Sequence, residues 1–349
     1  MKRDIITIGG SAGCLDPLTM IVKSLPQNFP GTVFVVIHLS PDYSSVLDML
    51  LARAGQLPAS QPSDHELLRT GHIYVARPDH HLAVEDGRIR IQRGPRENRH
   101  RPAIDPLFRT AAREYGPRVI AILLSGMQDD GAAGILAVRG RGGIAIVQDP
   151  NEAKWDQMPR RALRYGGADF ILSAEKIGPK VLTLMEFEGA EAMSKKDKAK
   201  RMVGAGSGNE DPERNLEATN GNEGEGTPSV FACPECHGVL WELKDNEMVR
   251  FRCRVGHSYG SESLSLELSH SAETALWAAM RALEEKAAMQ KRVAESATTM
   301  EPVARRLREQ SEADDANAKV IRDIIFHRDD RLEEANQFED DEPTQQVAS

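Results

Sequence analysis

The chain has 349 residues and a net charge of -9, with 40% hydrophobic and 28% charged residues. This length suits two or three domains, and the composition is ordinary for a soluble globular protein. The charge is uneven, because residues 1–187 hold 23 Lys and Arg against 20 Asp and Glu, whereas the remainder holds 21 against 33. An acidic back half argues against nucleic acid as the partner of the whole chain. No apolar run reaches the roughly 20 residues of a membrane span and no secretory signal is present, so we expect a cytoplasmic protein without membrane insertion.

Short β-branched runs alternate with helical stretches from residue 4 to about residue 187. Five of these runs predict buried strands: DIITIG, TVFVVIH, RVIAILLSG, GGIAIVQ and ADFILS. Such alternation predicts a doubly wound, mostly parallel sheet with helices on both faces, which is a three-layer α/β/α fold. One interruption, GHIYVARPDHHLAVEDGRIRIQR, contains Pro-Asp and Asp-Gly turn signals and predicts antiparallel hairpin structure. Residues 1–187 therefore form the expected first domain.

The rest of the chain divides into four expected parts. Residues 188–229 are rich in Gly, Asn, Glu and Lys and predict a disordered linker, because they cannot bury enough apolar surface to offset chain entropy. Residues 230–260 hold a compact Cys/His segment, separate from the first domain. Residues 261–337 predict two long helices whose apolar spacing suits a helical hairpin or a coiled coil between copies. The last twelve residues, 338–349, are expected to be an acidic disordered tail.

Three polar residues follow three of the predicted strands. Ser11 lies in a G-x-S-x-G turn after the first strand, His38 ends the second strand, and Asp130 follows the strand of RVIAILLSG. In a parallel sheet the carboxyl ends of the strands share one edge, where open α/β folds bind ligands. A nucleophile, a base and a carboxylate therefore converge there. In that arrangement His38 removes the proton of Ser11, and the carboxylate orients and stabilises the imidazole.

Each of these residues also has a simpler interpretation. A glycine-rich turn after a first strand is often a phosphate or dinucleotide cradle, and a histidine at a strand end is often structural. Asp129 and Asp130 are suited to cap the helix that follows them. A dinucleotide site, however, needs G-x-G-x-x-G and an acidic residue at the end of the second strand, whereas this sequence has GGSAGC and His38. A nucleotide-binding oxidoreductase is therefore disfavoured.

Five segments carry a family resemblance: IGGSAG, VIHLSP, HRPAIDPLF, LLSGMQDDGAAG and QMPRRAL. In this order, over nearly all of residues 4–187, they resemble the successive motifs of the bacterial chemotaxis protein-glutamate methylesterases. The resemblance implies a catalytic triad of Ser11, His38 and Asp130, and a backbone N–H of Met127 that helps to hold the oxyanion. It implies a methylated chemoreceptor as the substrate, no cofactor for catalysis, and deamidation of receptor glutamines as an additional activity.

The sequence departs from the family pattern at three points. Ala12 stands where family members usually have threonine, so rate or substrate choice is expected to differ. Cys14 stands where they usually have glycine, and we expect a packed thiol there rather than a nucleophile. A phospho-receiver domain usually precedes the esterase in this family. None precedes the first strand of this sequence, so we expect no control by phosphorylation within the chain.

Four residues in the back half have the spacing of a zinc ribbon. Cys233 and Cys236 form a C-x-x-C knuckle, and Cys253 and His257 follow as a C-x-x-x-H pair. Four such ligands suit tetrahedral zinc, and four protein ligands leave no open position for catalysis. A module this small needs a metal because its apolar core is thin. The alternatives are a reduced, metal-free loop and ligation through His237, which lies awkwardly close to Cys236.

The sequence thus favours a protein-glutamate methylesterase that serves a chemosensory pathway. An arginine-rich segment either faces the acidic helices of a receptor or forms a solvated loop; its members are Arg93, Arg96, Arg99 and Arg101. The alternative function is an inactive esterase-fold scaffold that binds signalling partners through the zinc ribbon and the helices. Self-association through the C-terminal helices is compatible with either hypothesis.

Overall fold

The computed structural model describes residues 2–41, 44–186, 226–245, 248–296 and 301–339. They divide into two compact units, Met1–Leu264 and Ser265–Ser349. Most of the expected linker and most of the expected acidic tail lie outside the described residues. None of the helices in the described part of the chain combines the length and apolarity needed to cross a membrane.

A seven-stranded parallel sheet forms the centre of the first unit. Its strands in spatial order are β3 (Ala59–Ser60), β4 (His72–Val75), β2 (Thr32–Ile37), β1 (Ile5–Gly10), β7 (Val119–Leu123), β8 (Ile144–Gln148) and β9 (Phe170–Leu172). Every pairing within it is parallel. The five predicted strands are confirmed as β1, β2, β7, β8 and β9. The chain moves outward from β1 through β2 in one direction and later through β7 in the other, so the strand order reverses between β1 and β7.

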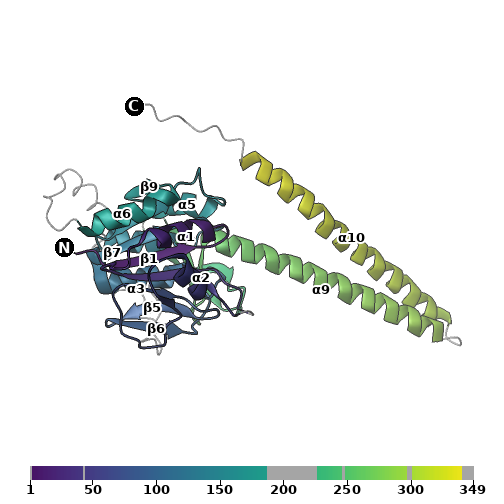
Figure 1. Ribbon diagram of the computed structural model, residues 1–349. Coiled ribbons are helices and arrows are strands. Elements are labelled where there is room, and N and C mark those ends of the chain that lie inside the picture. The colour runs from purple at the N-terminus through teal and green to yellow at the C-terminus, as the bar shows by residue number, and fades with distance from the viewer. Residues whose placement is uncertain (1, 42–43, 187–225, 246–247, 297–300, 340–349) are drawn as a thin grey trace. The chain divides into compact units, whose positions relative to one another are not determined.

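Helices cover both faces of this sheet, as the alternation of the sequence predicts (Figure 1). One face carries α1 (Leu15–Ser24), α2 (Leu47–Ala54) and α6 (Ala174–Glu186). The other carries α3 (Ile104–Tyr115), α4 (Ala132–Gly140), α5 (Gln157–Arg161) and the π-helical turn Ala162–Gly166, with a 3-10 turn Gly116–Arg118 before β7. Along β7, Val119, Ala121 and Leu123 pack toward α3, while Ile120 and Ile122 pack toward the opposite layer. A strand buried on both faces is apolar throughout, which explains its continuous run of apolar residues.

The expected hairpin forms only in part. Strands β5 (His81–Glu85) and β6 (Arg88–Gln92) pair antiparallel through a two-residue turn, in which Asp86 and Gly87 both have positive φ. This is the turn that an Asp-Gly dipeptide favours. The preceding residues His72–Val75 do not join the hairpin and instead form β4, parallel to β2.

A four-stranded antiparallel sheet follows in the chain and belongs to the same compact unit. It consists of β10 (Thr227–Ala232), β11 (Val239–Asp245), β12 (Met248–Cys253) and β13 (Ser258–Gly260), in that order. We expected this Cys/His module to be separate from the first domain. The structure differs, because β13 and the residues that follow it make hydrogen bonds and an ion pair with the α/β part.

Two long helices, α9 (Ser261–Ser296) and α10 (Glu301–Glu339), confirm the helices predicted at the C-terminal end. Within the second unit, Met280 of α9 packs against Ala318 and Ile325 of α10. An ion pair of 3.0 Å joins Lys286 Nζ to Asp314 Oδ2 beside this seam. The two helices therefore bury apolar side chains against each other, which is how an amphipathic helix is stabilised.

Candidate active site

The carboxyl ends of the three central strands bring together the residues that the sequence singles out. Gly10 of β1 is in register with Ile37 of β2, so Ser11 and His38 are the next residues of two neighbouring strands. The His38 N–H donates to the Gly10 carbonyl across 3.3 Å. Asp130 follows β7 on the other side of β1. The three residues thus lie at the point where the strand order reverses, which is where doubly wound folds bind their ligands.

His38 and Asp130 are in direct contact. The distance from His38 Nε2 to Asp130 Oδ2 is 2.7 Å, and the side chains are 6% and 1% exposed. Burial favours the neutral form of Asp130. The hydrogen bond from His38 and its electrostatic attraction, aided by the backbone N–H of Ile104, nonetheless hold the pKa of Asp130 well below its ordinary value. A carboxylate fixed in this way is charged throughout the neutral range and orients the imidazole.

The N-terminus of α3 supplies further donors to the same carboxylate. The backbone N–H groups of Ile104 and Asp105 donate to Asp130 over 2.7 and 3.2 Å. Gly131 N–H and the side-chain amide of Asn98 add two bonds of 3.0 Å each. A helix N-terminus has unsatisfied N–H groups and a partial positive charge, so it stabilises a buried anion. With the His38 bond, the carboxylate of Asp130 accepts five hydrogen bonds.

The second ring nitrogen of His38 is the one available to act as a base. His38 Nδ1 is buried and has no hydrogen-bond partner among the described residues. Because Nε2–H donates to Asp130, Nδ1 carries the lone pair that can accept a proton. Ser11, half-buried after the neighbouring strand, likewise has no side-chain hydrogen bond within the described part of the chain. The arrangement leaves a base nitrogen and a hydroxyl unengaged at the same sheet edge.

The loop after β7 leaves one backbone donor free beside Ser11. Ser125 N–H donates to Gln148 Oε1, and Gly126 N–H donates to the Trp155 carbonyl. The N–H of Met127 has no backbone acceptor among the described residues. A Cβ on Gly126 would approach Ser11 Cβ to 3.0 Å, so glycine keeps the loop close to the serine. Met127 N–H is therefore suited to stabilise a developing oxyanion.

A second histidine packs on the first. The rings of His38 and His100 are stacked with centroids 3.5 Å apart and an interplanar angle of 14°. Burial, reinforced by the nearby His38, lowers the pKa of His100 to about 3. His100 is therefore neutral at physiological pH and confines the His38 ring without adding a second charge.

Two other side chains have roles that the structure makes clear. The Cys14 thiol is 2% exposed, and burial raises its pKa to about 12, which is consistent with a packed thiol rather than a nucleophile. Arg101 donates to Asp79 Oδ1 and to the Gly94 carbonyl, and its side chain is only 16% exposed. This member of the arginine-rich segment therefore stabilises the fold rather than facing a receptor.

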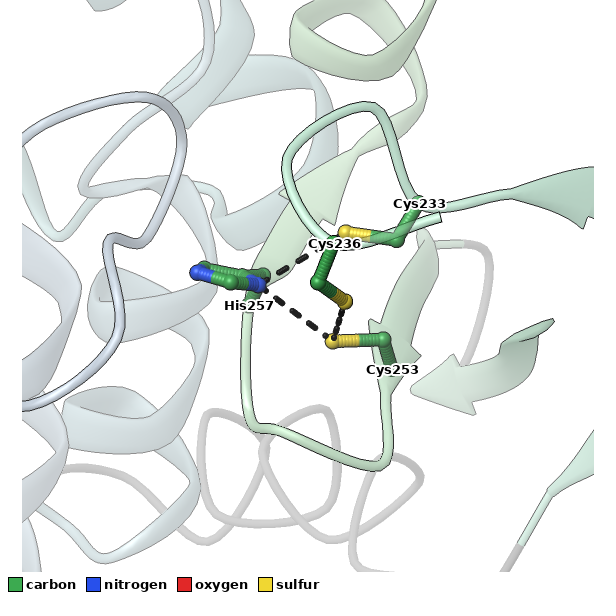
Figure 2. A group of neighbouring side chains, drawn as sticks. All are labelled: Cys233, Cys236, Cys253 and His257. Carbon is green, nitrogen blue, oxygen red and sulfur yellow. Dashed lines mark hydrogen bonds between the residues drawn. The ribbon is translucent and has the colours of Figure 1, made fainter. Parts of the chain in front are cut away.

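The four predicted metal ligands lie together in the antiparallel sheet. Figure 2 shows three cysteine sulfurs and the His257 ring around one centre, and their ligand atoms all lie within 4.8 Å of one another. Cys236 Sγ is 3.6 Å from Cys253 Sγ, and His257 Nδ1 is 3.5 Å from Cys253 Sγ. His257 Nε2 contacts Glu235 Oε2 at 3.2 Å. A carboxylate thus holds the ring through the nitrogen that does not face the cysteines, as is common in metal sites. This cluster could hold a metal ion.

Asn98, His100 and Asp105 are site residues that the sequence analysis did not identify. His100 and Asp105 lie within HRPAIDPLF, the third of the resembling segments, but the sequence gives no sign that they touch His38 or Asp130. Asn98 precedes that segment. Its role depends on Gly260, more than 160 positions later, whose N–H donates to Asn98 Oδ1. No local pattern predicts such a contact.

The fold and the site together define a doubly wound α/β protein with a serine, a histidine and an aspartate at its switch point. A family model described as CheB methylesterase matches residues 6–181, half of the chain. The chain belongs to the CheB methylesterase family. It is also similar to the crystal structure of the Thermotoga maritima CheB methylesterase catalytic domain, with 33% identity and a TM-score of 0.50. That match covers 53% of this chain and all of the other.

Curated relatives carry the name protein-glutamate methylesterase/protein-glutamine glutaminase. One from Xanthomonas oryzae pv. oryzae is 31% identical over 186 residues, which are 52% of this chain and 53% of the relative. One from Xanthomonas campestris pv. campestris is 34% identical over 184 residues, 52% of this chain and 51% of the relative. One from Methanosarcina mazei is 29% identical over 191 residues, 52% of each chain. The chain thus spans about half the length of the curated relatives that it matches.

The buried carboxyl of Asp105 predicts a pH dependence of stability. Burial, reinforced by the Asp130 charge, raises the pKa of Asp105 to about 7 from an ordinary value of 3.8. Between these two values the folded state holds a proton that the unfolded state releases, so rising pH lowers the free energy of unfolding. Asparagine does not titrate. We therefore expect the free energy of unfolding of Asp105→Asn, relative to that of the wild type, to increase as pH rises from about 4 to about 7. Above about 8 the difference between the two proteins should be constant. Urea unfolding at each pH measures this, and a difference that is flat across the window would contradict it.

Proposed function

We propose that this chain is a serine esterase that hydrolyses methyl esters of glutamate side chains in a chemoreceptor-type protein. The observation that carries the proposal is the 2.7 Å contact between His38 Nε2 and the buried Asp130 carboxylate, beside Ser11 on the next strand. Membership of the CheB methylesterase family supports it. Relatives whose names include protein-glutamine glutaminase support deamidation of glutamines by the same acyl transfer.

The proposed reaction has two steps, each served by His38. Ser11 Oγ attacks the ester carbonyl carbon while His38 Nδ1 takes its proton, and the oxyanion accepts a hydrogen bond from Met127 N–H. Collapse of the tetrahedral intermediate breaks the bond to the methoxy oxygen, and His38 Nδ1 donates its proton to departing methanol. Water then attacks the glutamyl-serine ester, with His38 again as base; the bond to Ser11 Oγ breaks, His38 returns the proton to Ser11, and the receptor is left with a glutamate side-chain carboxylate. Asp130 stabilises the imidazolium in both steps. The reaction needs no cofactor.

We also propose that Cys233, Cys236, Cys253 and His257 hold a structural zinc ion. The donor set supports this, because three thiolates and one imidazole suit tetrahedral zinc. With Zn–S bonds of about 2.3 Å, tetrahedral geometry separates two sulfurs by about 3.8 Å. The distance of 3.6 Å between Cys236 Sγ and Cys253 Sγ fits that value. When bound, the zinc would hold the knuckle and the hairpin of this small sheet together.

The proposal places the enzyme in the cytoplasm, with a methylated receptor as its substrate and nucleic acid excluded as a partner. The second candidate, an inactive scaffold, is favoured by one observation: Ala12 replaces the threonine that usually follows the nucleophile in this family. Self-association through α9 and α10 is compatible with apolar side chains that stay exposed on these helices, such as Val320 and Ile324. A fluorophosphonate probe distinguishes the two candidates, because a scaffold should not be labelled at Ser11.

Substitution of the triad tests the esterase directly. Ser11→Ala and His38→Ala should each lower turnover of a model ester by roughly 10⁴- to 10⁶-fold, because triad members act as a unit. The double variant should be little slower than either single one. The steady-state rate and the mass of the probe adduct are the measurements. Cys14→Ala is the matched control, because the thiol is buried and outside the reaction. Substantial hydrolysis by folded Ser11→Ala protein would contradict the assignment.

Removal of the thiols tests the metal. Purified protein should contain one zinc ion per chain, and Cys233→Ser with Cys236→Ser should abolish it, since a serine hydroxyl is a poor zinc ligand. Cys14→Ala removes the one cysteine outside the ligand cluster and should keep the full zinc content. Elemental analysis of protein prepared without chelators measures both, and an absence of zinc in the wild type would overturn the assignment.

A further inference from the structure

The edge strand of the Cys/His sheet pairs with the segment that precedes α3. Asn98 N–H donates to the Ser258 carbonyl over 2.8 Å, and Ser258 N–H donates to the Arg96 carbonyl over 3.4 Å. Glu97 and Ser258 form a parallel bridge. Because β13 is the last strand of its sheet, residues 96–98 continue that sheet by one short strand.

The side chain of Asn98 joins this strand to the buried aspartates. Asn98 Oδ1 accepts a hydrogen bond of 2.9 Å from Gly260 N–H. Asn98 Nδ2 donates to Asp130 Oδ1 over 3.0 Å and to Asp105 Oδ2 over 3.1 Å. One end of the amide is thus held by β13, and both hydrogens at the other end are used by carboxylates. The amide cannot rotate without removing a donor from each aspartate.

Further contacts surround the loop that carries Asp130. Ser263 O–H donates to Asp129 Oδ1 over 2.5 Å, and Arg161 forms an ion pair of 2.6 Å with Glu262. Met248 of β12 packs on Ala132 at the start of α4. The segment after Asn98 continues directly to His100, whose ring is stacked on His38. The Cys/His sheet therefore touches the elements that hold both the carboxylate and the imidazole.

We propose that the Cys/His sheet is a positioning element of the esterase site and that Asn98 is the positioning residue through which it acts. In this arrangement the metal keeps β13 in place, β13 fixes Asn98, and Asn98 holds Asp130 and the strand that leads to His100. The inference rests on the proposed esterase activity. It predicts that loss of the metal slows hydrolysis although no triad residue changes, because misplacing a catalytic group by about 1 Å can cost about 10²-fold in rate.

The variant Gly260→Ala tests the contact of β13 with Asn98 separately from metal binding. A Cβ at this position would lie 2.0 Å from Asp129 Oδ2, so either β13 or the Asp129 side chain, which Ser263 holds, must move, while the four ligands stay unchanged. Gly238→Ala is the matched control in the loop between β10 and β11, since its Cβ would meet nothing closer than Cys236 Sγ at 3.7 Å. Both variants should keep one metal ion per chain. Only Gly260→Ala should raise the amide hydrogen exchange of residues 96–101.

The kinetic arm uses the full chain. Gly260→Ala and Asn98→Ala should lower kcat about 10- to 100-fold with KM within about twofold, since Asn98 acts on the triad rather than on the substrate. Chelation of zinc from the wild type should raise exchange at residues 96–101 and lower kcat, and added zinc should restore both. This arm keeps the test valid if Gly260→Ala fails to fold.

Three outcomes would overturn the inference. One is exchange at residues 96–101 that is unchanged in both Gly260→Ala and zinc-free protein. The second is unchanged kcat when exchange rises, and the third is an effect of equal size in Gly238→Ala. If wild-type protein hydrolyses no ester, the proposed function fails instead, and the exchange data alone decide whether β13 holds Asn98.

Discussion

The buried carboxylate of Asp130 is the interaction on which the site depends. A charge with 1% exposure is stable only where donors replace the water it has lost. Here one donor comes from the strand end at His38, two from the first turn of α3, one from Gly131 and one from Asn98. The carboxylate thus fixes the distance between β2, α3 and the loop after β7. The same bonds that stabilise the charge also orient the imidazole of His38, the proposed base.

This constraint explains why two neighbouring groups, Asp105 and His100, favour their neutral forms. Asp105 shares the Asn98 amide with Asp130, and two carboxylates so close together cannot both be ionised without cost. The raised pKa of Asp105 is the result. His100 is neutral for a related reason, because burial and a stacked imidazole both disfavour its protonated form. The site therefore concentrates one permanent negative charge beside one imidazole, which is what proton transfer from a serine requires.

The sequence predicted the centre of the molecule well and its long-range contacts poorly. Strands such as β7 are buried on both faces and give continuous apolar runs, and the carboxyl-edge rule then brings Ser11, His38 and Asp130 to one rim. The hairpin prediction is wrong for His72–Val75, which forms β4. A run of four residues does not show whether it pairs with the next strand in the chain or with β2. The contact of Gly260 with Asn98 joins residues far apart in the chain, and no periodicity or turn signal marks it. The Cys/His spacing predicted the ligand cluster but not the surface on which its sheet packs.

The most direct test of the account is methanol release from a receptor fragment that carries glutamyl methyl esters. The chemistry proposed at Ser11 predicts one methanol for each ester lost and one new glutamate carboxylate, both detectable by mass spectrometry. Catalytic amounts of folded, zinc-loaded protein should complete this conversion, and a fluorophosphonate adduct at Ser11 should stop it. Protein that is folded and zinc-loaded but releases no methanol from the fragment would contradict the account.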